Sequence, residues 1–340
     1  MLTRSGYIVN NPPPELKKEL TVRAIVNDDF GFPPPPFKVF RPTKNGICVP
    51  RYYGISKLGE PTEDKRPEPT RTRVKFHGTL RDATHQNAAL AAAIDAGHGV
   101  LSLPCGFGKT TVSLAIACKL GYRTMIIVHK EFLANQWEER IKQFCPGATI
   151  GRVQQNKKDV ECDFVIAMLQ SLSLKEYTFG DFDSIGTLIV DEAHHICAKV
   201  FSQSLFKMCP KHIFGLSATP NRKDGLTKVL HWFMGPTFFA VERENQQDVE
   251  VFPIEFECQR FRDPPPCTRI GKLSLSTMIT ELTENRERNS MLVGLISRIA
   301  KSTRQILVLS DRRQHCMICL LYTSDAADEG LGVDLGGRRI

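Results

Sequence analysis

The feature that most constrains this 340-residue chain is a glycine-rich turn directly after a short apolar run. Residues 100–103 read as a strand, and Gly106-Phe107-Gly108-Lys109-Thr110 follows it. A strand, turn and helix in this order aim backbone N–H groups at phosphates, and only glycine lets the backbone come so close. Lys109 would add positive charge and Thr110 a hydroxyl for a metal ion. The strict phosphate-loop consensus is not met, because Leu103 stands where its first glycine belongs.

A second motif, Leu188-Ile189-Val190-Asp191-Glu192-Ala193-His194, is an apolar strand that ends in two adjacent carboxylates. Asp191 would hold magnesium directly or through water, and Glu192 would polarise the attacking water. The glycine turn alone could be an ordinary turn before a helix. Together with the acidic pair, it predicts an enzyme that hydrolyses a magnesium-bound nucleoside triphosphate.

These two motifs and Ser217-Ala218-Thr219 resemble those of superfamily 2 helicases in order and spacing, and in particular those of DEAH-type DNA translocases. More narrowly, residues 104–110 and 215–225 resemble the transcript-release helicases of large cytoplasmic DNA viruses, whose cellular relatives are the XPB repair helicases. The resemblance covers about residues 80–318. It implies an ATP-dependent DNA helicase or translocase with ATP and Mg²⁺ as cofactors, nucleic acid as partner and the transcription machinery as a further partner.

The resemblance also implies roles for residues around the two motifs. In the family a glutamine before the helix that leads to the phosphate loop reads adenine, which places Gln86 there with Arg81 beside it; the alternative is an exposed helical glutamine. The nucleotide-binding candidates are Arg81, Gln86, Gly106, Phe107, Gly108, Lys109, Thr110 and Thr111, and the catalytic candidates are Lys109, Asp191, Glu192 and His194. Thr110 and Asp191 are the metal candidates.

Coupling of the nucleotide to nucleic acid would run through small polar side chains. His194 would link the two sites in the resemblance, whereas His195 beside it is expected to be structural. Ser217 and Thr219 could relay by hydrogen bonds, or could form a simple ST-turn instead.

Contacts to the backbone of a nucleic-acid strand are expected after the next two strands of the motor domain. Lys130 and Gln136 are candidates after the first of these, and Gln170 after the second. Trp137 is flanked by the helix-spaced apolar residues Leu133 and Ile141, so core packing is favoured for it. Arg222 and Lys223 are weaker candidates.

The chain alternates strand and helix patterns from about residue 76 to 245, which predicts an α/β fold with a parallel sheet between helices. We expect this segment to be the first RecA-like motor domain, with both nucleotide motifs beyond the carboxyl ends of its strands. The expected elements are strands at 100–103, 124–128, 164–168, 187–190 and 212–216, a helix from 109 and a helix over 131–144.

The flanking segments differ in character. Residues 1–75 contain two proline clusters and short strand-like runs at 22–26 and 37–40, and form a small accessory domain in this interpretation, which either grips the substrate or only packs. A proline-rich and charged stretch, 61–73, reads as a linker. Residues 246–318 read as the start of a second, truncated RecA-like domain. Its expected elements are strands at 252–256 and 305–309 and a helix over 286–300.

The last segment, residues 319–340, resembles the translation of a transposase-type sequencing adapter; the alternative is a natural glycine-rich tail. Two motifs that reach into it are therefore not assigned functions. His315-Cys316-x-x-Cys319 imitates half of a zinc site, and Gly337-Arg338-Arg339 imitates a helicase arginine motif. The segment has two arginines and four carboxylates, so the net charge of +8 becomes +10 without it.

Composition limits the remaining possibilities. The basic excess suits a polyanionic partner without a dedicated basic tail, and eleven scattered cysteines read as reduced thiols. No apolar run approaches the roughly 18 residues of a membrane span. We therefore expect a soluble protein of the cytoplasm, a viral factory or a virion, with the nucleus as an alternative.

Two other functions remain open. One is an RNA helicase of the same superfamily. The other is a binding module, because the arginine finger of such motors normally comes from the second motor domain and contributes roughly 10³ to 10⁵ in rate. In that case the 340-residue polypeptide binds ATP and nucleic acid but turns ATP over slowly.

Overall fold

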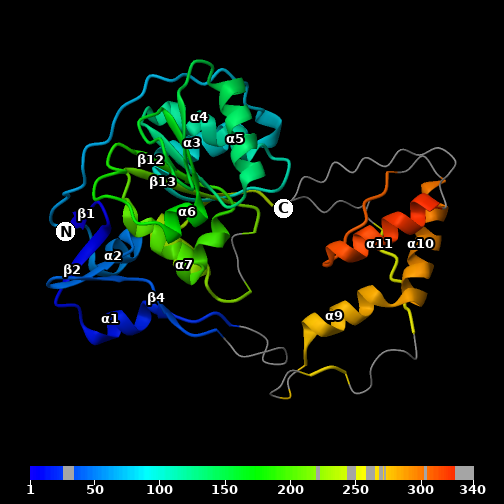
Figure 1. Ribbon diagram of the computed structural model, residues 1–340. Helices are drawn as coiled ribbons and strands as arrows, with labels where there is room; N and C mark the ends of the chain where they lie inside the picture. The colour runs from blue at the N-terminus through cyan, green and yellow to red at the C-terminus, as the bar shows by residue number, and fades with distance from the viewer. Residues whose placement is uncertain are drawn as a thin grey trace. The chain divides into compact units, whose positions relative to one another are not determined.

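The computed structural model describes residues 1–25, 34–219, 223–242, 250–257, 265–267, 271, 273–301 and 305–325 (Figure 1). These residues divide into two compact units. The first contains the described residues up to 242, and the second contains those from 250 onward. The two units are described separately below.

A sheet of eight strands, counted within the described residues, forms the middle of the first unit in the order β10-β9-β11-β8-β12-β13-β7-β14. Its strands are β7 (His98–Ser102), β8 (Thr124–Val128), β9 (Ile150–Gln154), β10 (Lys157–Lys158), β11 (Phe164–Met168), β12 (Thr187–Val190), β13 (His212–Ser217) and β14 (Thr237–Ala240). All neighbouring pairs are parallel except β10 with β9. The predicted α/β fold with a parallel sheet is confirmed.

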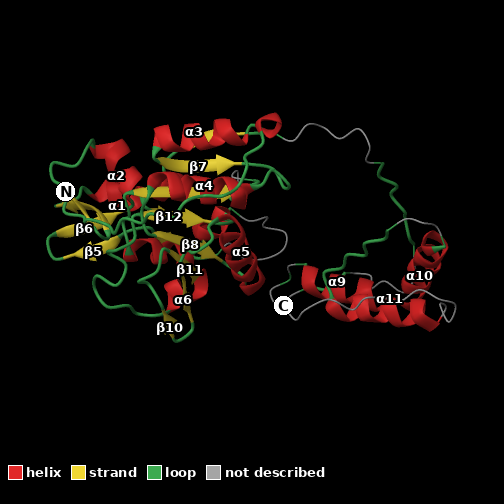
Figure 2. Cartoon of the chain, turned by 90° about the horizontal axis from the view of Figure 1, so that it is seen from above, coloured by secondary structure: helices red, strands yellow, loops and turns green. Residues whose placement is uncertain are grey.

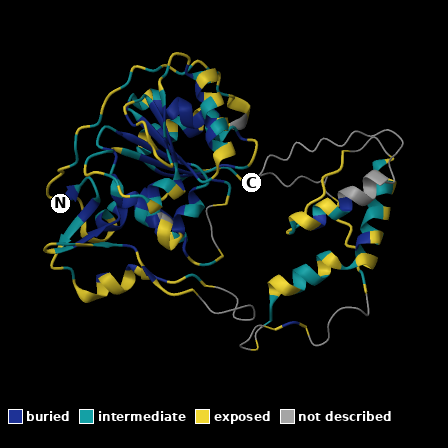
Figure 3. Ribbon diagram, in the orientation of Figure 1, coloured by how far each residue is buried: buried dark blue, intermediate teal, exposed yellow. Residues whose placement is uncertain are grey.

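Both faces of this sheet are apolar because helices cover both (Figures 2 and 3). Alternate residues of β8 show the arrangement: Ile126 packs toward one core and Ile127 toward the other. The first core lies under α3 (Gln86–Ala96), α4 (Lys109–Leu120) and α5 (Glu131–Phe144), and the second under α6 (Leu169–Leu174), η3 (Ala193–Cys197) and α8 (Thr227–Met234). Two-sided burial explains why the strands are continuous apolar runs.

The N-terminal region has a small antiparallel sheet in the order β1-β2-β6-β5. Its elements are β1 (Leu2–Thr3), β2 (Gly6–Asn10), α1 (Pro14–Glu19), β3 (Thr21–Val22), β4 (Phe37–Lys38), β5 (Arg41–Thr43), β6 (Gly46–Val49) and α2 (Arg51–Leu58). The strand runs expected at 22–26 and 37–40 form only the two-residue strands β3 and β4, which pair with each other. Val26 lies outside the described residues.

The N-terminal region packs on the motor sheet and shares its core. Tyr52 belongs to the same buried cluster as Val100 of β7, and its ring stacks on His98 with centroids 4.1 Å apart. The neighbouring Tyr53 meets Trp232 of α8 edge to face at 5.2 Å. Burial of these aromatic side chains makes the region part of the first unit.

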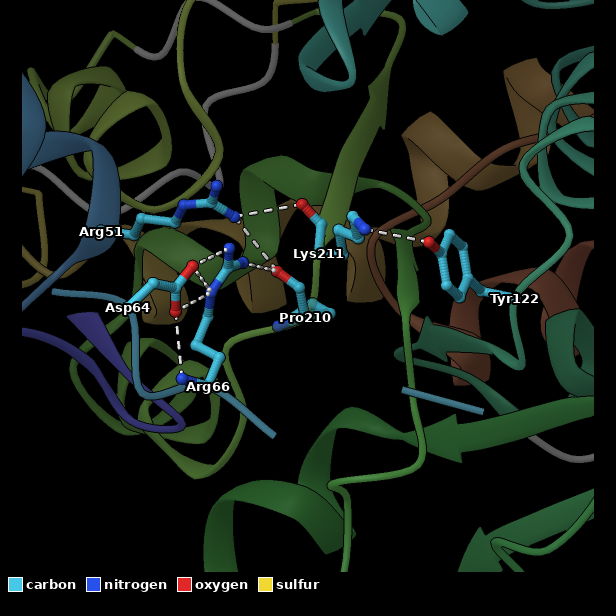
Figure 4. A network of polar contacts seen from close by, with 6 residues as sticks. All are labelled: Arg51, Asp64, Arg66, Tyr122, Pro210 and Lys211. Carbon is cyan, nitrogen blue, oxygen red and sulfur yellow. Dashed lines mark hydrogen bonds and ion pairs between the residues drawn. The ribbon is translucent and has the colours of Figure 1, made fainter. Parts of the chain in front are cut away.

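Two arginines from the N-terminal side clasp the turn before β13 (Figure 4). Arg51 Nη1 donates to the carbonyl oxygens of Pro210 and Lys211, both at 3.1 Å. Arg66 Nη1 donates to the Pro210 oxygen at 3.0 Å, while its Nη2 pairs with Asp64 at 2.6 Å. The segment expected as a linker, residues 61–73, is thus fixed to the motor domain.

Backbone hydrogen bonds extend this attachment along the segment. The N–H of Thr70 donates to the Ser184 oxygen and the N–H of Thr72 to the Gly121 oxygen, each at 3.0 Å. The stretch forms no helix or strand, as its proline content indicates. These hydrogen bonds nevertheless hold it against the motor domain.

The second unit is helical in its described part, with α9 (Leu275–Glu284), α10 (Arg286–Ala300) and α11 (Arg313–Asp325). The helix expected over 286–300 matches α10, whose N-cap Asn285 accepts a hydrogen bond from the Arg288 N–H at 2.9 Å. The strands expected at 252–256 and 305–309 are wrong. Both stretches are irregular and exposed, because the described part of this unit offers no strand to pair with.

The histidine of the half zinc motif forms hydrogen bonds through both ring nitrogens. His315 Nε2 lies 3.0 Å from Asn289 Oδ1, and its Nδ1 lies 2.9 Å from Ser310 Oγ. No group of three or more metal-binding side chains occurs among the residues that the structure describes. The arginine-like motif at 337–339 lies outside them.

Candidate nucleotide site

The two nucleotide motifs leave the same edge of the sheet. The glycine turn follows β7 and Asp191 follows β12, with only β13 between these parallel strands. Two strand spacings amount to about 10 Å, a gap that a magnesium-bound triphosphate can bridge. The carboxyl edge of a parallel sheet is also where such folds bind ligands.

The phosphate loop depends on its two glycines for different reasons. Gly106 has φ +82° with open space around an added Cβ, whereas Gly108 has φ +92° and an added Cβ would lie 2.8 Å from Gln86 Nε2. Phe107 between them is buried in the core and anchors the loop. Helix α4 begins at Lys109, directly after Gly108, so its N-terminal N–H groups face the loop.

Gln86 is bonded to the phosphate loop. It is the first residue of α3 and only 2% exposed. Its Nε2 donates to the Phe107 oxygen at 2.6 Å, and its Oε1 accepts from the Arg81 N–H at 2.9 Å. The alternative of an exposed glutamine is therefore wrong. The amide connects the loop to Arg81 and holds the loop through the Phe107 oxygen.

Lys109 reaches back inside the loop. Its Nζ donates to the Leu103 oxygen at the end of the entering strand, at 3.2 Å. Thr110 and Thr111 follow in the first turn of α4, both half-buried. An ammonium and hydroxyls at this place suit the β- and γ-phosphates and their metal ion.

The Asp191 carboxylate has two hydrogen-bond donors. Oδ1 accepts from the Glu192 N–H at 3.0 Å, and Oδ2 accepts from the indole Nε1–H of Trp137 at 2.9 Å. Glu192 itself has φ +47°, which is unusual for a residue other than glycine and is found preferentially at functional sites.

Magnesium fits this donor set. Each oxygen of Asp191 accepts one protein hydrogen bond and keeps a further lone pair, and the hydroxyl of Thr110 adds a second hard oxygen donor. Mg²⁺ is commonly held by one or two carboxylates together with substrate phosphates and water. Two protein oxygens, completed by phosphate oxygens and water, are therefore compatible with this ion.

His194 lies between the acidic pair and Ser217. Its Nδ1 is 3.5 Å from Glu192 Oε2 and 3.4 Å from Ser217 Oγ. Ser217 is fully buried, and its Oγ accepts from the Thr219 N–H at 3.2 Å. The expected ST-turn is therefore present, and the same hydroxyl also faces the histidine.

Comparison with known proteins decides the family. The family described as "Type III restriction enzyme, res subunit" matches residues 79–222. The chain is 33% identical over 363 residues to a protein of Acanthamoeba polyphaga mimivirus that is named as an ATP-dependent RNA helicase, with 99% of this chain and 69% of that protein covered. The chain belongs to the superfamily 2 helicases.

Two further proteins are similar to a large part of this chain. The helicase is 29% identical over 317 residues to a helicase of Invertebrate iridescent virus 6, with 88% of this chain and 68% of that protein covered. The UvsW helicase from bacteriophage T4 matches with a TM-score of 0.45 and 13% identity over 67% of this chain and 94% of that chain. Superfamily 2 helicases hydrolyse ATP and act on nucleic acid, so this helicase is an ATP-hydrolysing enzyme with a nucleic-acid partner.

The nucleic-acid candidates of the helicase lie at the ends of β8 and β11. Lys130 is the exposed N-cap of α5, and Gln136 is exposed further along that helix. Gln170 is also exposed, and its Nε2 donates to the His129 oxygen at 2.8 Å. Lys223 is exposed, whereas Arg222 lies outside the described residues.

Three imidazole rings pack against one another in tilted geometry, and one of them belongs to His129 beside Lys130. The ring of His195 lies 4.0 Å from that of His129 and 4.3 Å from that of His194, measured between centroids. Burial, followed by the nearby charge of Lys130, lowers the pKa of His129. His195 therefore joins the acidic motif to the end of β8, a packing role that agrees with its expected structural character.

Phe132 and the partner of the Trp137 indole were not identified from the sequence. Phe132, in the first turn of α5, is 60% exposed, with Lys130 Nζ 5.9 Å from its ring centroid. An exposed aromatic ring next to a cation is a signal for base stacking that the sequence offered. The bond between Trp137 and Asp191 gave no such signal, although Trp137 is buried as expected.

No helix in the described part of the helicase is long and apolar enough to cross a bilayer.

Proposed function

We propose that this helicase uses ATP to move along or unwind DNA. The observation that supports it best is the shared sheet edge: the loop that contains Lys109 and the strand that ends at Asp191 are separated by β13 alone. ATP with Mg²⁺ would bind there, with Thr110 and Asp191 as metal ligands and Glu192 orienting water. Gln86 and Arg81 would lie beside the adenine, as in the family resemblance.

Coupling to nucleic acid has a route in this proposal. The contact of His194 with Glu192 and with Ser217 joins the hydrolytic side chains to the turn after β13. Lys130, Gln136 and Gln170 would hold the phosphates of one strand. A change at the γ-phosphate would then reach the nucleic-acid edge through short side-chain contacts.

DNA is the proposed substrate because the motifs resemble those of DEAH-type DNA translocases, and transcription or repair is the proposed setting. RNA is the second candidate, because the mimivirus relative is named as an RNA helicase. The net charge of +8 favours a polyanion but does not distinguish the two. The viral relatives support a place in a viral factory in the cytoplasm. A partnership with transcription proteins is proposed from the motif resemblance alone.

The test is phosphate release by a chain that carries a complete second motor domain, with single-stranded DNA, duplex DNA and RNA of equal length. We expect DNA to stimulate hydrolysis more than RNA, and Lys109→Ala to abolish the stimulated rate. Lys119→Ala is the matched control, since Lys119 is exposed near the other end of the same helix. Unchanged turnover in Lys109→Ala would refute the nucleotide site, and stronger stimulation by RNA would favour the second candidate.

The domain assignment is part of the proposal. Residues 1–75 would be the accessory domain, 76–245 the first motor domain and 246–318 the beginning of the second. On this assignment the 340-residue polypeptide binds ATP but hydrolyses it slowly. The rate of the polypeptide alone, compared with that of a chain carrying a complete second motor domain, measures this.

An adapter origin for residues 319–340 is also a proposal. The alignment with the mimivirus protein covers 99% of the chain and so extends into this segment. Sequencing an independent clone across codon 318 decides it, because an adapter disappears from a longer insert and a natural tail persists.

A further inference from the structure

Trp137 and Asp191 are joined although they lie 54 residues apart in the chain. The indole Nε1–H donates to Asp191 Oδ2 at 2.9 Å, and the Trp137 side chain is 1% exposed. A buried indole N–H requires an acceptor, and a carboxylate is a strong one. This contact does not follow from any of the motifs that define the family.

The fold explains why the pair meets. Asp191 follows β12, which pairs with β8, and α5 with Trp137 follows β8. Trp137 packs in the core beside Ala134 and Ile141, so its ring has a fixed place. The second donor, the Glu192 N–H, holds the other carboxylate oxygen. Rotation of the carboxylate is therefore restrained at both oxygens.

We propose that Trp137 is a positioning residue that orients the Asp191 carboxylate toward the metal ion of the bound nucleotide. The inference rests on the proposed role of Asp191. The indole would act through Asp191 and would not itself hold the metal; it takes up one lone pair of Oδ2 and restrains the orientation of the carboxylate. Partners of this kind typically change metal affinity or activity by about 10-fold to 100-fold when they are lost.

The first experiment replaces Trp137 by Phe, which keeps an aromatic ring and removes only the N–H donor and part of the ring volume. We expect the Mg²⁺ concentration at half-maximal ATP hydrolysis to rise by about tenfold, with KM for ATP at saturating Mg²⁺ little changed. Trp232→Phe is the matched control, because Trp232 is the other of the two tryptophans and packs on Tyr53. Unaltered Mg²⁺ dependence in folded Trp137→Phe protein overturns the proposal.

A second experiment needs no turnover. In the Trp232→Phe background Trp137 is the single tryptophan, and its emission reports the hydrogen bond of its indole. We expect Asp191→Ala to shift this emission in the absence of nucleotide, and Mg²⁺ with a non-hydrolysable ATP analogue to shift it while Asp191 is present. Emission that is the same with and without Asp191→Ala overturns the bond itself, even where hydrolysis still depends on Asp191. If both Lys109→Ala and Asp191→Ala still hydrolysed ATP at the normal rate, the proposed function itself would be refuted.

Discussion

The Gln86 side chain donates a hydrogen bond of 2.6 Å to the backbone oxygen of Phe107, so the residue expected to read adenine also holds the phosphate loop. Two roles can coexist because the amide nitrogen has a second N–H. The brace is internal to the first unit and requires no ligand. It makes the shape of the loop depend on α3, an element outside the phosphate-loop motif.

Replacement of Gln86 should therefore weaken both stability and nucleotide binding. In Gln86→Glu the side chain keeps its shape and can still accept from the Arg81 N–H, but it no longer donates to Phe107. We expect a loss of about 1–3 kcal/mol in unfolding free energy and weaker ATP binding. Denaturant titration and a fluorescent-nucleotide assay measure these. The exposed neighbour Asn87→Ala is the control, and equal behaviour of the two variants would contradict the brace.

The two loop glycines should respond unequally to alanine. Both have positive φ, which costs about 1–2 kcal/mol for a residue with a Cβ. Only at Gly108 does the new Cβ also collide with Gln86 Nε2, at 2.8 Å, while Gly106 has open space. We expect Gly108→Ala to lose more stability and more nucleotide affinity than Gly106→Ala. Thermal unfolding of both proteins checks the order, and the reverse order is inconsistent with the structure.

The hydrogen bonds of Arg51 and Arg66 to the turn before β13 form an N-terminal clasp that should hold residues 1–75 on the motor domain. Arg66→Ala removes the donor to the Pro210 oxygen and the partner of Asp64, for a loss of about 1–3 kcal/mol. Limited proteolysis should then cut between residues 61 and 73 faster. Lys65→Ala is the control, since Lys65 forms an exposed pair with Glu63 that is worth little. Equal cleavage rates in the two variants would show that the clasp is dispensable.

Mild acid should destabilise the first unit through two half-buried histidines. Burial lowers the pKa of His98 and of His212 below the ordinary value of 6.5, with the charge of Arg51 adding to this effect at His98. The unfolded chain then binds more protons than the folded one below about pH 6.5, so stability is complete above that pH and falls as the pH decreases toward the folded pKa values. Melting temperatures between about pH 7.5 and about pH 5.5 should decrease, and His98→Gln should lessen the decrease. An identical decrease in His98→Gln would exclude His98 as a source.

Phe132 should contribute to nucleic-acid binding. Base stacking on an aromatic ring is worth about 1–3 kcal/mol, so Phe132→Ala should weaken single-strand binding roughly tenfold or more. Phe179→Ala is a matched control, because Phe179 is 80% exposed, lies 3.8 Å from the Arg4 guanidinium and precedes β12, whereas the acidic motif follows that strand. Fluorescence anisotropy with a labelled strand measures both. Equal affinities would remove Phe132 from the interface.

The local sequence pattern was sufficient to predict the buried central strands of the motor sheet. β8, β11 and β12 begin and end where the sequence predicts, because a strand covered on both faces is a continuous apolar run. β9, β10 and β14 were missed. β9 contains Arg152 and Gln154 among its residues, and so lacks that signature.

Partners distant along the chain were beyond any local pattern. The strands expected at 252–256 and 305–309 have the right residues but no neighbouring strand in the described part of their unit, and a strand forms only with a partner to bond. The N-terminal segments were expected to form a small accessory domain that grips the substrate or only packs, and the shared core of Tyr52 and Val100 was not visible in the local pattern.

The candidate site divides in the same way. Residue type and spacing were enough to single out the candidate phosphate loop and the acidic pair, since glycine torsions and adjacent carboxylates are properties of short segments. The partners of those groups were decided by folding: Gln86 beneath Phe107, and Trp137 against Asp191. A hydrogen bond between residues far apart in the chain exists only where helices and strands are packed together, and that packing is a property of the whole core.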